Sequence, residues 1–399
     1  MKIVIVSTFY SEGMGYSENC LPKSLSKLGH EVHVVTSNLN IYGNETGYFK
    51  TYGSFLGPAD QGTGKSSIDG YTLHRLPSQI IWGYVNIKKL HNKIKEIAPD
   101  IVHTNEIAAF HTFKLAFYKP LLKYKLFTES HQHLSVVKPY LKDNTRISFK
   151  KSGYWLTRTL PSFLAGKAIE KCYAIAPDCA LVANKYYGLP EKKIKVQHLG
   201  TDTDLFRPAT TEEEKNKREL LRSQLGYAEN DIVCIYTGRF SKDKNPLLLA
   251  MSINKLSAES LPFQGLFIGE GVQKDEILEL NKTKVLSFVK HIALADYYMI
   301  SDIAIWPTQE SMSMLDAASS GLPLIVSDKI GEYDRIEGNG KVYKEGDFNN
   351  LYEVLQTLSD KKERERLGNV GREKMINFYS WNNIAKNVEK DYFSCLSQP

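Results

Sequence analysis

Short runs rich in β-branched residues alternate with longer helix-like segments along nearly all of this 399-residue chain. Strands with few polar interruptions indicate a sheet that is covered on both faces, and the front half holds five such runs, at residues 2–7, 31–37, 100–104, 125–130 and 194–199. Helix-like segments such as 17–29 and 86–98 lie between them. This alternation predicts a parallel sheet with right-handed crossovers.

The same alternation restarts in the back half, with strand-like runs at residues 231–237, 264–269, 284–289, 302–308 and 322–328. Turn-forming residues between the two halves predict a hinge near 200–215. We therefore predict an α/β protein with two doubly wound, Rossmann-like domains. The first domain is expected at 1–205 and the second at 206–379. Residues 380–399 are expected to form a helix, capped by Ser380, that packs back towards the first domain.

Composition excludes several classes of protein. The apolar runs are shorter than the roughly 20 residues that a membrane span needs, and residues 1–10 resemble a first strand more than a signal peptide. Five scattered cysteines without CxxC spacing indicate neither a disulfide framework nor a zinc site. Basic residues are not interleaved with aromatic residues as in RNA-binding motifs, so no nucleic-acid partner is expected. We expect a cytoplasmic protein.

Positive charge is concentrated in the front half. Residues 1–205 contain 26 Lys/Arg and 16 Asp/Glu, whereas residues 206–399 contain 25 and 29. This asymmetry indicates either an anionic partner, such as a membrane surface or a charged substrate, or a solvated basic surface. Residues 140–171 mix seven Lys/Arg with aromatic side chains, which fits a helix at the inner face of an anionic membrane, a helix lining an acceptor cleft, or a plain solvated helix.

Two cations follow the first strand of the back half, in "YTGRFSKDKNP" (236–246). In doubly wound sheets, ligands bind beyond the carboxyl ends of strands, where helix N-termini offer free N–H groups. The guanidinium of Arg239 and the ammonium of Lys244 suit a diphosphate at such a position. The alternative is that both are solvated surface cations.

Two acids follow a later strand, in "PTQESMSMLDAASSGLP" (307–323). Glu310 stands where the strand ends and Asp316 falls in the first turns of the next helix, so both can accept hydrogen bonds from sugar or ribose hydroxyls. The alternative is a capping box with a favourable acid near the helix N-terminus. Ser311 and Ser313 are candidate caps. The backbone N–H groups expected to point at the ligand are those of Ser313, Met314 and Leu315.

The chain resembles a family 4 glycosyltransferase in its motifs and in their order. These are, from the N-terminus, "GMGY", "LFTESH", "GTDTDLFRP", "GRFSKDKN", "GEG", "ASSGLPLIVSD" and "YSW". The resemblance implies the GT-B fold, in which the two Rossmann-like domains face each other across a cleft. It also implies a retaining, metal-independent hexosyltransferase that moves sugar from a nucleoside diphosphate to a saccharide or lipid-linked acceptor in glycan biosynthesis. It implies no cofactor beyond the nucleotide sugar, with UDP favoured and GDP second.

The resemblance also implies roles for individual residues. Arg239 and Lys244 would neutralise the donor diphosphate, and Gly15, which lacks a Cβ, would let the backbone approach the β-phosphate. Main-chain atoms of Ile292 would meet the nucleobase. His131, with His133 as the competing position, would reach the donor sugar.

Glu310 and Asp316 would take the places of the two acids of the family's E-x7-E motif, on the sugar hydroxyls and the ribose. Five residues rather than seven separate them here, and the second acid is an aspartate. This departure keeps open an inactive nucleotide-sugar-binding protein as an alternative. A GT-B sugar phosphorylase or epimerase is another. A dinucleotide-dependent oxidoreductase is disfavoured, because no GxGxxG motif follows a strand.

Overall fold

The computed structural model describes residues 1–45, 47–81, 83–138, 149–308 and 310–397. The chain forms two compact units. The first comprises Met1–Glu12, Tyr16–Leu199 and Ile384–Pro399, and the second comprises Gly13–Gly15 and Gly200–Asn383. The boundaries predicted at 205/206 and 379/380 lie a few residues from these divisions.

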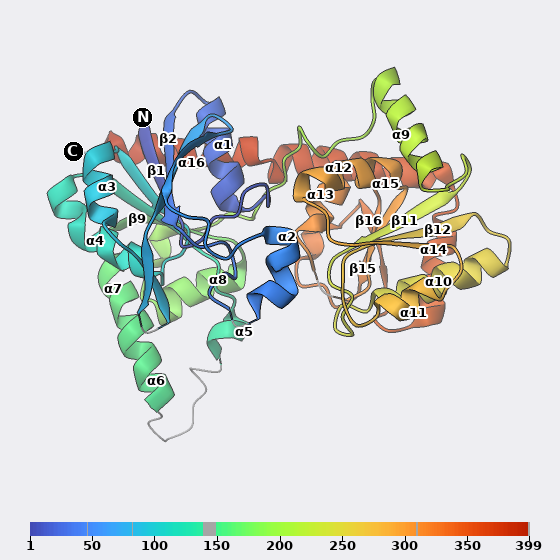
Figure 1. Ribbon diagram of the computed structural model, residues 1–399, viewed down its shortest axis with the longest axis horizontal. Helices are drawn as coiled ribbons and strands as arrows, with labels where there is room; N and C mark the ends of the chain where they lie inside the picture. The colour runs from blue at the N-terminus through green and yellow to red at the C-terminus, as the bar shows by residue number, and fades with distance from the viewer. Residues whose placement is uncertain (46, 82, 139–148, 309, 398–399) are drawn as a thin grey trace. The chain divides into compact units, whose positions relative to one another are not determined.

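An eight-stranded sheet, in the order β10-β9-β8-β7-β1-β2-β4-β3, forms the centre of the first unit (Figure 1). Its strands are β1 (Lys2–Val6), β2 (Glu31–Ser37), β3 (Gly64–Ile68), β4 (Tyr71–Leu76), β7 (Ile101–Thr104), β8 (Lys125–Ser130), β9 (Ile169–Ala174) and β10 (Ile194–Val196). All neighbouring pairs are parallel except β3–β4. The predicted runs 31–37 and 125–130 coincide with β2 and β8, whereas the prediction of an all-parallel sheet is wrong at the β3 edge.

The sequence patterns missed the segment that contains β3, β4 and the separate hairpin of β5 (Ser78–Ile81) and β6 (Tyr84–Ile87). β3 reads "GKSSI" and is exposed along most of its length, so it lacks the apolar run of a buried strand. The helix expected over 86–98 begins only at Leu90, because the chain before it is β6. An edge strand is stabilised by backbone hydrogen bonds to the neighbouring strand, and local sequence does not reveal this pairing.

Helices connect the strands of the first unit. They are α1 (Ser17–Lys27), α2 (Ser54–Leu56), α3 (Leu90–Ile97), α4 (Phe110–Leu122), α5 (Leu134–Val137), α6 (Phe149–Tyr154), α7 (Leu160–Gly166) and α8 (Pro177–Leu181). Short π-helical turns cover Phe49–Gly53, Trp155–Thr159 and Val182–Tyr186, and a 3-10 turn covers Glu191–Lys193. Across the described part of the chain, no helix combines the length and hydropathy needed to cross a membrane.

The second unit contains a six-stranded, wholly parallel sheet in the order β13-β12-β11-β14-β15-β16. Numbered from β11, this is the order 3-2-1-4-5-6 of dinucleotide-binding folds. The strands are β11 (Ile232–Thr237), β12 (Phe263–Ile268), β13 (Thr283–Leu286), β14 (Ile303–Trp306), β15 (Leu324–Ser327) and β16 (Gly340–Tyr343). The sequence patterns predicted the first five of these strands and missed β16, which is only four residues long.

The helices of this unit are α9 (Glu212–Gln224), α10 (Pro246–Ala258), α11 (Lys274–Leu278), α12 (His291–Ile300), α13 (Ser313–Ser319), α14 (Phe348–Thr357) and α15 (Lys361–Lys374). A 3-10 turn covers Tyr333–Arg335 and a π-helical turn covers Met375–Tyr379. Local sequence explains several of their ends. At α9, for example, the side chain of Thr211 accepts from the backbone N–H of Glu214, and the Glu214 side chain returns to the Thr211 N–H to complete a capping box.

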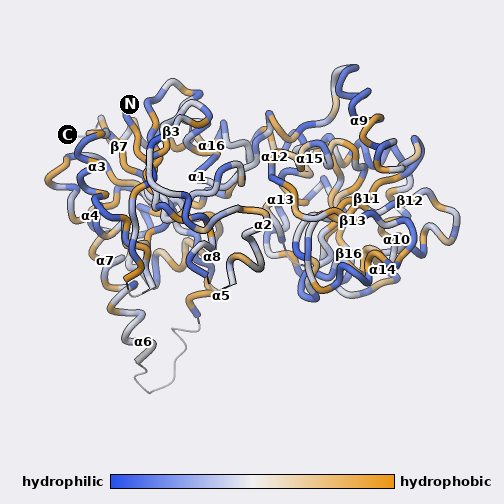
Figure 2. The backbone as a smooth tube through the Cα atoms, in the orientation of Figure 1, coloured by the Kyte–Doolittle hydropathy of each residue, from blue (hydrophilic) through white to orange (hydrophobic). Residues whose placement is uncertain are grey.

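Apolar residues gather along the central strands of both sheets (Figure 2). Every residue of β7, β11 and β14 is buried. Each buried Val, Ile or Leu side chain contributes about 1.5–3 kcal/mol relative to an exposed one, so these strands fix the position of the loops at their ends. The indole N–H of buried Trp306 donates to the Thr237 carbonyl at 3.1 Å, which ties the end of β14 to the end of β11.

The last helix, α16 (Trp381–Leu396), begins in the second unit and ends in the first. Trp381, Ile384, Val388 and Tyr392 are buried, in agreement with the helical spacing predicted for them. Ser380 acts as the expected cap, since its Oγ accepts from the backbone N–H of Asn382 at 3.2 Å. Within the first unit, the helix is held at Tyr392, whose hydroxyl lies 2.5 Å from His103 Nδ1.

Candidate functional site

The second unit has its topological switch point between β11 and β14. The chain continues from β11 towards β12 and β13 on one side, and from β14 towards β15 and β16 on the other. Loops that leave such a pair diverge at the carboxyl edge and leave a crevice where ligands bind. Thr308 Oγ1, in the loop after β14, donates to the carbonyl of Asp243, in the loop after β11, at 2.6 Å. The two sequence motifs therefore meet at one edge of the sheet.

Both predicted diphosphate cations lie in the loop after β11. Arg239 is exposed. Lys244 is partly buried and directly precedes Asn245, the N-cap residue of α10. The ammonium of Lys244 lies 3.5 Å from the carbonyl oxygen of Glu310. Burial lowers the pKa of Lys244, and the positive charge of Arg239 lowers it further. Two cations that repel each other at the edge of a crevice favour the binding of an anion between them.

Glycines fix the path of this loop. Gly269 and Gly271 of the "GEG" motif have φ of +157° and +153°. A Cβ added at Gly269 would lie 1.8 Å from the carbonyl oxygen of Gly238. The backbone N–H of Phe240 donates to the carbonyl of Glu270 at 2.8 Å. The motif after β12 thus supports the loop that carries the cations.

Glu310 makes contacts that the sequence did not predict. Its Oε1 accepts from the backbone N–H groups of Gly331 and Glu332, at 2.5 and 3.0 Å. Its Oε2 lies 3.4 Å from a guanidinium nitrogen of Arg335. The carboxylate is therefore attached to the loop after β15, and its contact with sugar hydroxyls stays a prediction.

Asp316 is buried, and both of its carboxylate oxygens have partners within the second unit. Oδ1 accepts from Thr201 Oγ1 at 2.7 Å, and Oδ2 lies 2.9 Å from His291 Nε2. Burial lowers the pKa of His291, but the hydrogen bond and charge of Asp316 outweigh this and raise it overall. The sequence patterns missed both partners. A usable signal was present for His291, which is the first residue of the helix after β13 and so lies at the carboxyl edge.

The N–H groups predicted to face a phosphate have partners in their own turn. The amide of Ser313 donates to Ser311 Oγ at 3.3 Å, and those of Met314 and Leu315 donate to the carbonyls of Ser311 and Met312 at 3.1 and 3.0 Å. Met312 occupies the cap position of α13, so the prediction that Ser313 caps this helix is wrong. The local reason is that Ser313 is itself the first helical residue.

Ile292 and Gly15 were the remaining predicted donor contacts. Ile292 is the second residue of α12, directly after His291, and 62% of it is exposed. Gly15 has φ of +71°, a left-handed conformation that favours glycine. A role for either residue at the donor stays a prediction.

In the first unit, the predicted catalytic histidine follows β8 directly. His131 Nε2 lies 2.5 Å from Glu129 Oε2, and the His131 backbone N–H donates to Glu106 Oε2 at 3.1 Å. Burial lowers the pKa of His131, but the hydrogen bond and charge of Glu129 raise it overall. The sequence patterns missed both acids, although "TESH" already placed one of them two residues from the histidine.

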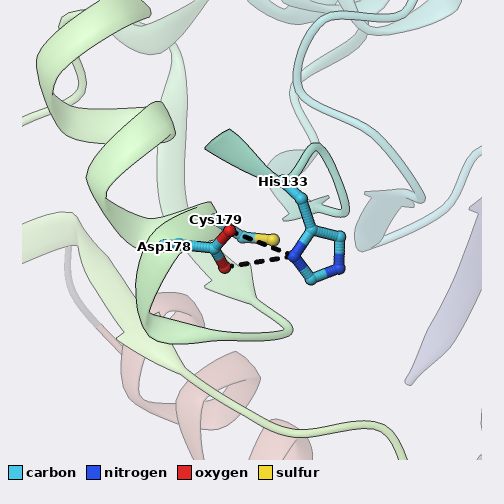
Figure 3. A group of neighbouring side chains, drawn as sticks. All are labelled: His133, Asp178 and Cys179. Carbon is cyan, nitrogen blue, oxygen red and sulfur yellow. Dashed lines mark hydrogen bonds and ion pairs between the residues drawn. The ribbon is translucent and has the colours of Figure 1, made fainter. Parts of the chain in front are cut away.

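The competing histidine has a different partner (Figure 3). His133 Nδ1 lies 3.1 Å from each carboxylate oxygen of Asp178, whose Oδ2 also accepts from the backbone N–H of Leu134 at 3.0 Å. Ligand atoms of His133, Asp178 and Cys179 lie within 4.8 Å of one another, as in a metal-binding group. Burial raises the pKa of the Cys179 thiol to about 12, which disfavours the thiolate that a metal requires. His133 is therefore best described as the partner of Asp178.

Two family models match the chain. Residues 21–205 match the model of Glycosyltransferase Family 4, and residues 217–374 match that of glycosyl transferases group 1.

Curated relatives are similar over part of their length. Spore coat protein SA of Bacillus subtilis is 28% identical over 221 residues, which are 50% of this chain and 58% of the relative. Lipopolysaccharide 1,2-N-acetylglucosaminetransferase of Salmonella typhimurium is 28% identical over 199 residues, which are 44% of this chain and 52% of the relative. The chain thus spans little more than half the length of these relatives.

Solved structures are similar over the whole chain. Alr3699/HepE of Anabaena, in complex with UDP, has a TM-score of 0.67 at 18% identity and covers 99% of this chain and 100% of its own. A glycosyltransferase of Rickettsia africae has a TM-score of 0.68 at 17% identity, with coverage of 100% and 99%. At such low identity, these similarities establish the fold alone.

Proposed function

We propose, from the premise that the chain belongs to glycosyltransferase family 4 and has the GT-B fold, that it is a retaining, metal-independent hexosyltransferase of glycan biosynthesis. The donor is a nucleoside-diphosphate sugar, with UDP favoured over GDP. The acceptor is a hydroxyl of a saccharide or a lipid-linked saccharide. Structures of Alr3699/HepE with UDP and with UDP-glucose support the donor class, and the Salmonella lipopolysaccharide relative supports the acceptor class.

The observation that carries this proposal is the pair of cations at the switch point of the second unit. Negative charge develops on the leaving diphosphate during transfer, and fixed positive groups stabilise it more in the transition state than in the ground state. Arg239 presents a planar fork of donors, and Lys244 adds a point charge beside it. Together they supply the charge that a divalent cation supplies in other transferases.

The other donor contacts follow the family pattern. We assign Glu310 to the sugar hydroxyls, Asp316 to the ribose and Ile292 to the base. The backbone at Gly15 approaches the β-phosphate, and His131 reaches the sugar. We also assign the backbone amides of Ser313, Met314 and Leu315 to the ligand, which requires each amide to exchange its partner within the turn for the ligand.

Arg239→Ala and Lys244→Ala test this proposal. Removing one preorganised partner of developing charge typically lowers turnover about 100- to 1,000-fold, and each variant should show such a loss in a UDP-release assay with sugar donors. The matched control is Lys242→Ala, an exposed cation of the same loop, which should keep wild-type turnover. Near-wild-type rates in both test variants would refute the diphosphate assignment.

A catalytically inactive, nucleotide-sugar-binding protein is the second candidate. It is favoured by the contacts of Glu310, whose carboxylate is held by Gly331, Glu332 and Arg335. Calorimetric titration with UDP-sugars, followed by NMR of the sugar product, separates the two. Binding without turnover in the presence of a panel of acceptors would support the inactive protein.

We further propose that the first unit contacts an anionic membrane peripherally. Trp155 and Leu156 are 53% and 60% exposed, Phe163 and Leu164 nearby are also exposed, and Lys167 lies over the ring of Phe163. Exposed apolar side chains beside lysines fit the interface of an anionic bilayer. Residues 140–148 of the segment that prompted this interpretation lie outside the described residues.

Co-sedimentation with vesicles of phosphatidylglycerol and phosphatidylcholine tests the membrane contact. The double variant Trp155→Ser, Leu156→Ser should lose binding to the anionic vesicles. Equal binding of the variant and the wild type would refute this surface.

A further inference from the structure

Three carboxylates, two of them buried, lie near the predicted catalytic histidine of the first unit. Glu18 comes from the first turn of α1, Glu106 from the segment after β7, and Glu129 from the end of β8. β1, which leads into α1, and β7 are neighbours at the switch point of this sheet, and β8 lies next to β7. These acids therefore collect at its carboxyl edge, where ligands of doubly wound sheets bind.

Glu129 is held in place by contacts other than the one with His131. Its Oε2 accepts from Ser17 Oγ at 3.1 Å, and its Oε1 lies 3.6 Å from His103 Nε2. Its side chain is only 10% exposed. A buried carboxylate that is hydrogen-bonded from another element can fix the ring that bonds to it.

His131 is held by two hydrogen bonds. Its ring nitrogen Nε2 is hydrogen-bonded to the Glu129 carboxylate, and its backbone N–H donates to the Glu106 carboxylate. Glu106 is itself held, because its Oε1 accepts from the backbone N–H of Ala108 at 3.0 Å. Among the described residues, no hydrogen bond to Nδ1 of His131 is found, and 29% of the side chain is exposed. Nδ1 is thus the ring atom left for a ligand.

Charges around the ring favour its protonated form. Glu129, Glu106 and Glu18 all raise the pKa of His131. His103, the other histidine of the cluster, does not compete for the proton, because burial lowers its pKa. Burial raises the pKa of Glu18 to about 7, so the net charge of the cluster changes near neutral pH.

The proton on the ring decides what Nδ1 can do. When Nε2–H donates to Glu129 in a neutral ring, Nδ1 carries a lone pair and only accepts. When the ring is protonated, Nδ1–H donates to a sugar oxygen and brings positive charge to it.

We propose that Glu129 is a positioning residue for sugar transfer: it binds Nε2 of His131, directs Nδ1 to the donor sugar and keeps the ring protonated, so that Nδ1 donates. This inference rests on the proposed transferase function. It assigns to this chain an ion pair, Glu129–His131, as the unit that acts on the sugar.

Glu129→Gln removes the charge but keeps an acceptor for Nε2–H. The first measurement is a pH titration of the His131 ring by NMR of ¹⁵N-histidine-labelled protein without ligand. A neighbouring opposite charge shifts a pKa by about 1 to 3 units, so the pKa of His131 should fall by that range in the variant. Glu18→Gln should lower it less, because Glu18 acts through charge and not through a hydrogen bond to the ring.

Glu389→Gln is the matched control, since Glu389 pairs with His30 Nε2 at 2.7 Å in the same unit but beside the amino end of β2. It should leave the titration of His131 unchanged. An unchanged pKa of His131 in Glu129→Gln would overturn the proposal. Glu129→Asp, which restores the charge, should return the pKa towards the wild-type value and guards against a folding defect.

The second measurement is the pH dependence of kcat. Because the protonated ring is the active form, the alkaline limb should move to lower pH in Glu129→Gln, and the rate above that limb should fall about tenfold for each unit of pKa lost. An active variant with an unmoved limb overturns the positioning role. A wild-type protein that binds UDP and transfers no sugar overturns the proposed function instead, and the two failures are distinguishable.

Discussion

Asp316→Asn is the perturbation whose size follows most directly from the structure. The carboxylate is 7% exposed and accepts from Thr201 Oγ1 and His291 Nε2. Asparagine keeps one acceptor oxygen and replaces the other by an NH₂ group. A hydrogen bond to a charged group contributes about 1.5–3 kcal/mol, so the second unit should lose about that much free energy of unfolding. Asp316→Ala leaves the buried Thr201 hydroxyl and the half-buried His291 ring without this acceptor and should cost more, about 3–5 kcal/mol.

The loss should depend on pH, with a sign set by His291. Because Asp316 raises the pKa of His291 in the folded state, the stabilisation is complete below the unfolded value, about 6.5, and is lost as the pH rises through the folded pKa. The gap in stability between wild type and Asp316→Asn should therefore be largest near pH 6. It should shrink by pH 9.

Urea titration monitored by ¹⁹F NMR of 5-fluorotryptophan-labelled protein is the assay. Trp306 is buried in the second unit, so its resonance reports unfolding of that unit separately from the first. The control is Asp296→Asn, which breaks an exposed pair with Lys217 and should cost less than about 1 kcal/mol. A gap below about 0.5 kcal/mol for Asp316→Asn, or one equal at pH 6 and pH 9, would refute the pairing.

Three further predictions each have their own measurement. Arg222→Met should destabilise the second unit by at least about 1–3 kcal/mol, because the guanidinium is 4% exposed and donates to Asp302 and to the buried carbonyl of Ile300, which would lose this donor; urea unfolding measures the loss. Gly269→Ala should lower affinity for UDP in calorimetry, since the added Cβ overlaps the backbone of Gly238 and displaces the cation loop; unchanged affinity would contradict this. Thr211→Ala should cost about 1 kcal/mol through the lost cap of α9, and a thermal melt shows whether it does.

Local sequence patterns were sufficient to predict most strands of the two sheets. Buried parallel strands are continuous apolar runs, and β2 and β8 were predicted to the residue. Glycine, proline and charge at strand ends also marked the loops that carry Arg239 and Lys244, because ligands of doubly wound sheets bind at those ends. The motif order then indicated the family.

Partners of buried polar groups could not be predicted in the same way. Ser17 and Glu129 are separated by 112 positions, and Thr201 and Asp316 by 115. The polar strand β3 is likewise held by pairing with β4 and not by its own sequence. The sequence by itself determined the periodicity, the turns and the residue types at strand ends. Only the tertiary structure decided which acid pairs with which histidine, because a buried carboxylate bonds to whatever donor packing brings within about 3 Å, however distant that donor lies along the chain.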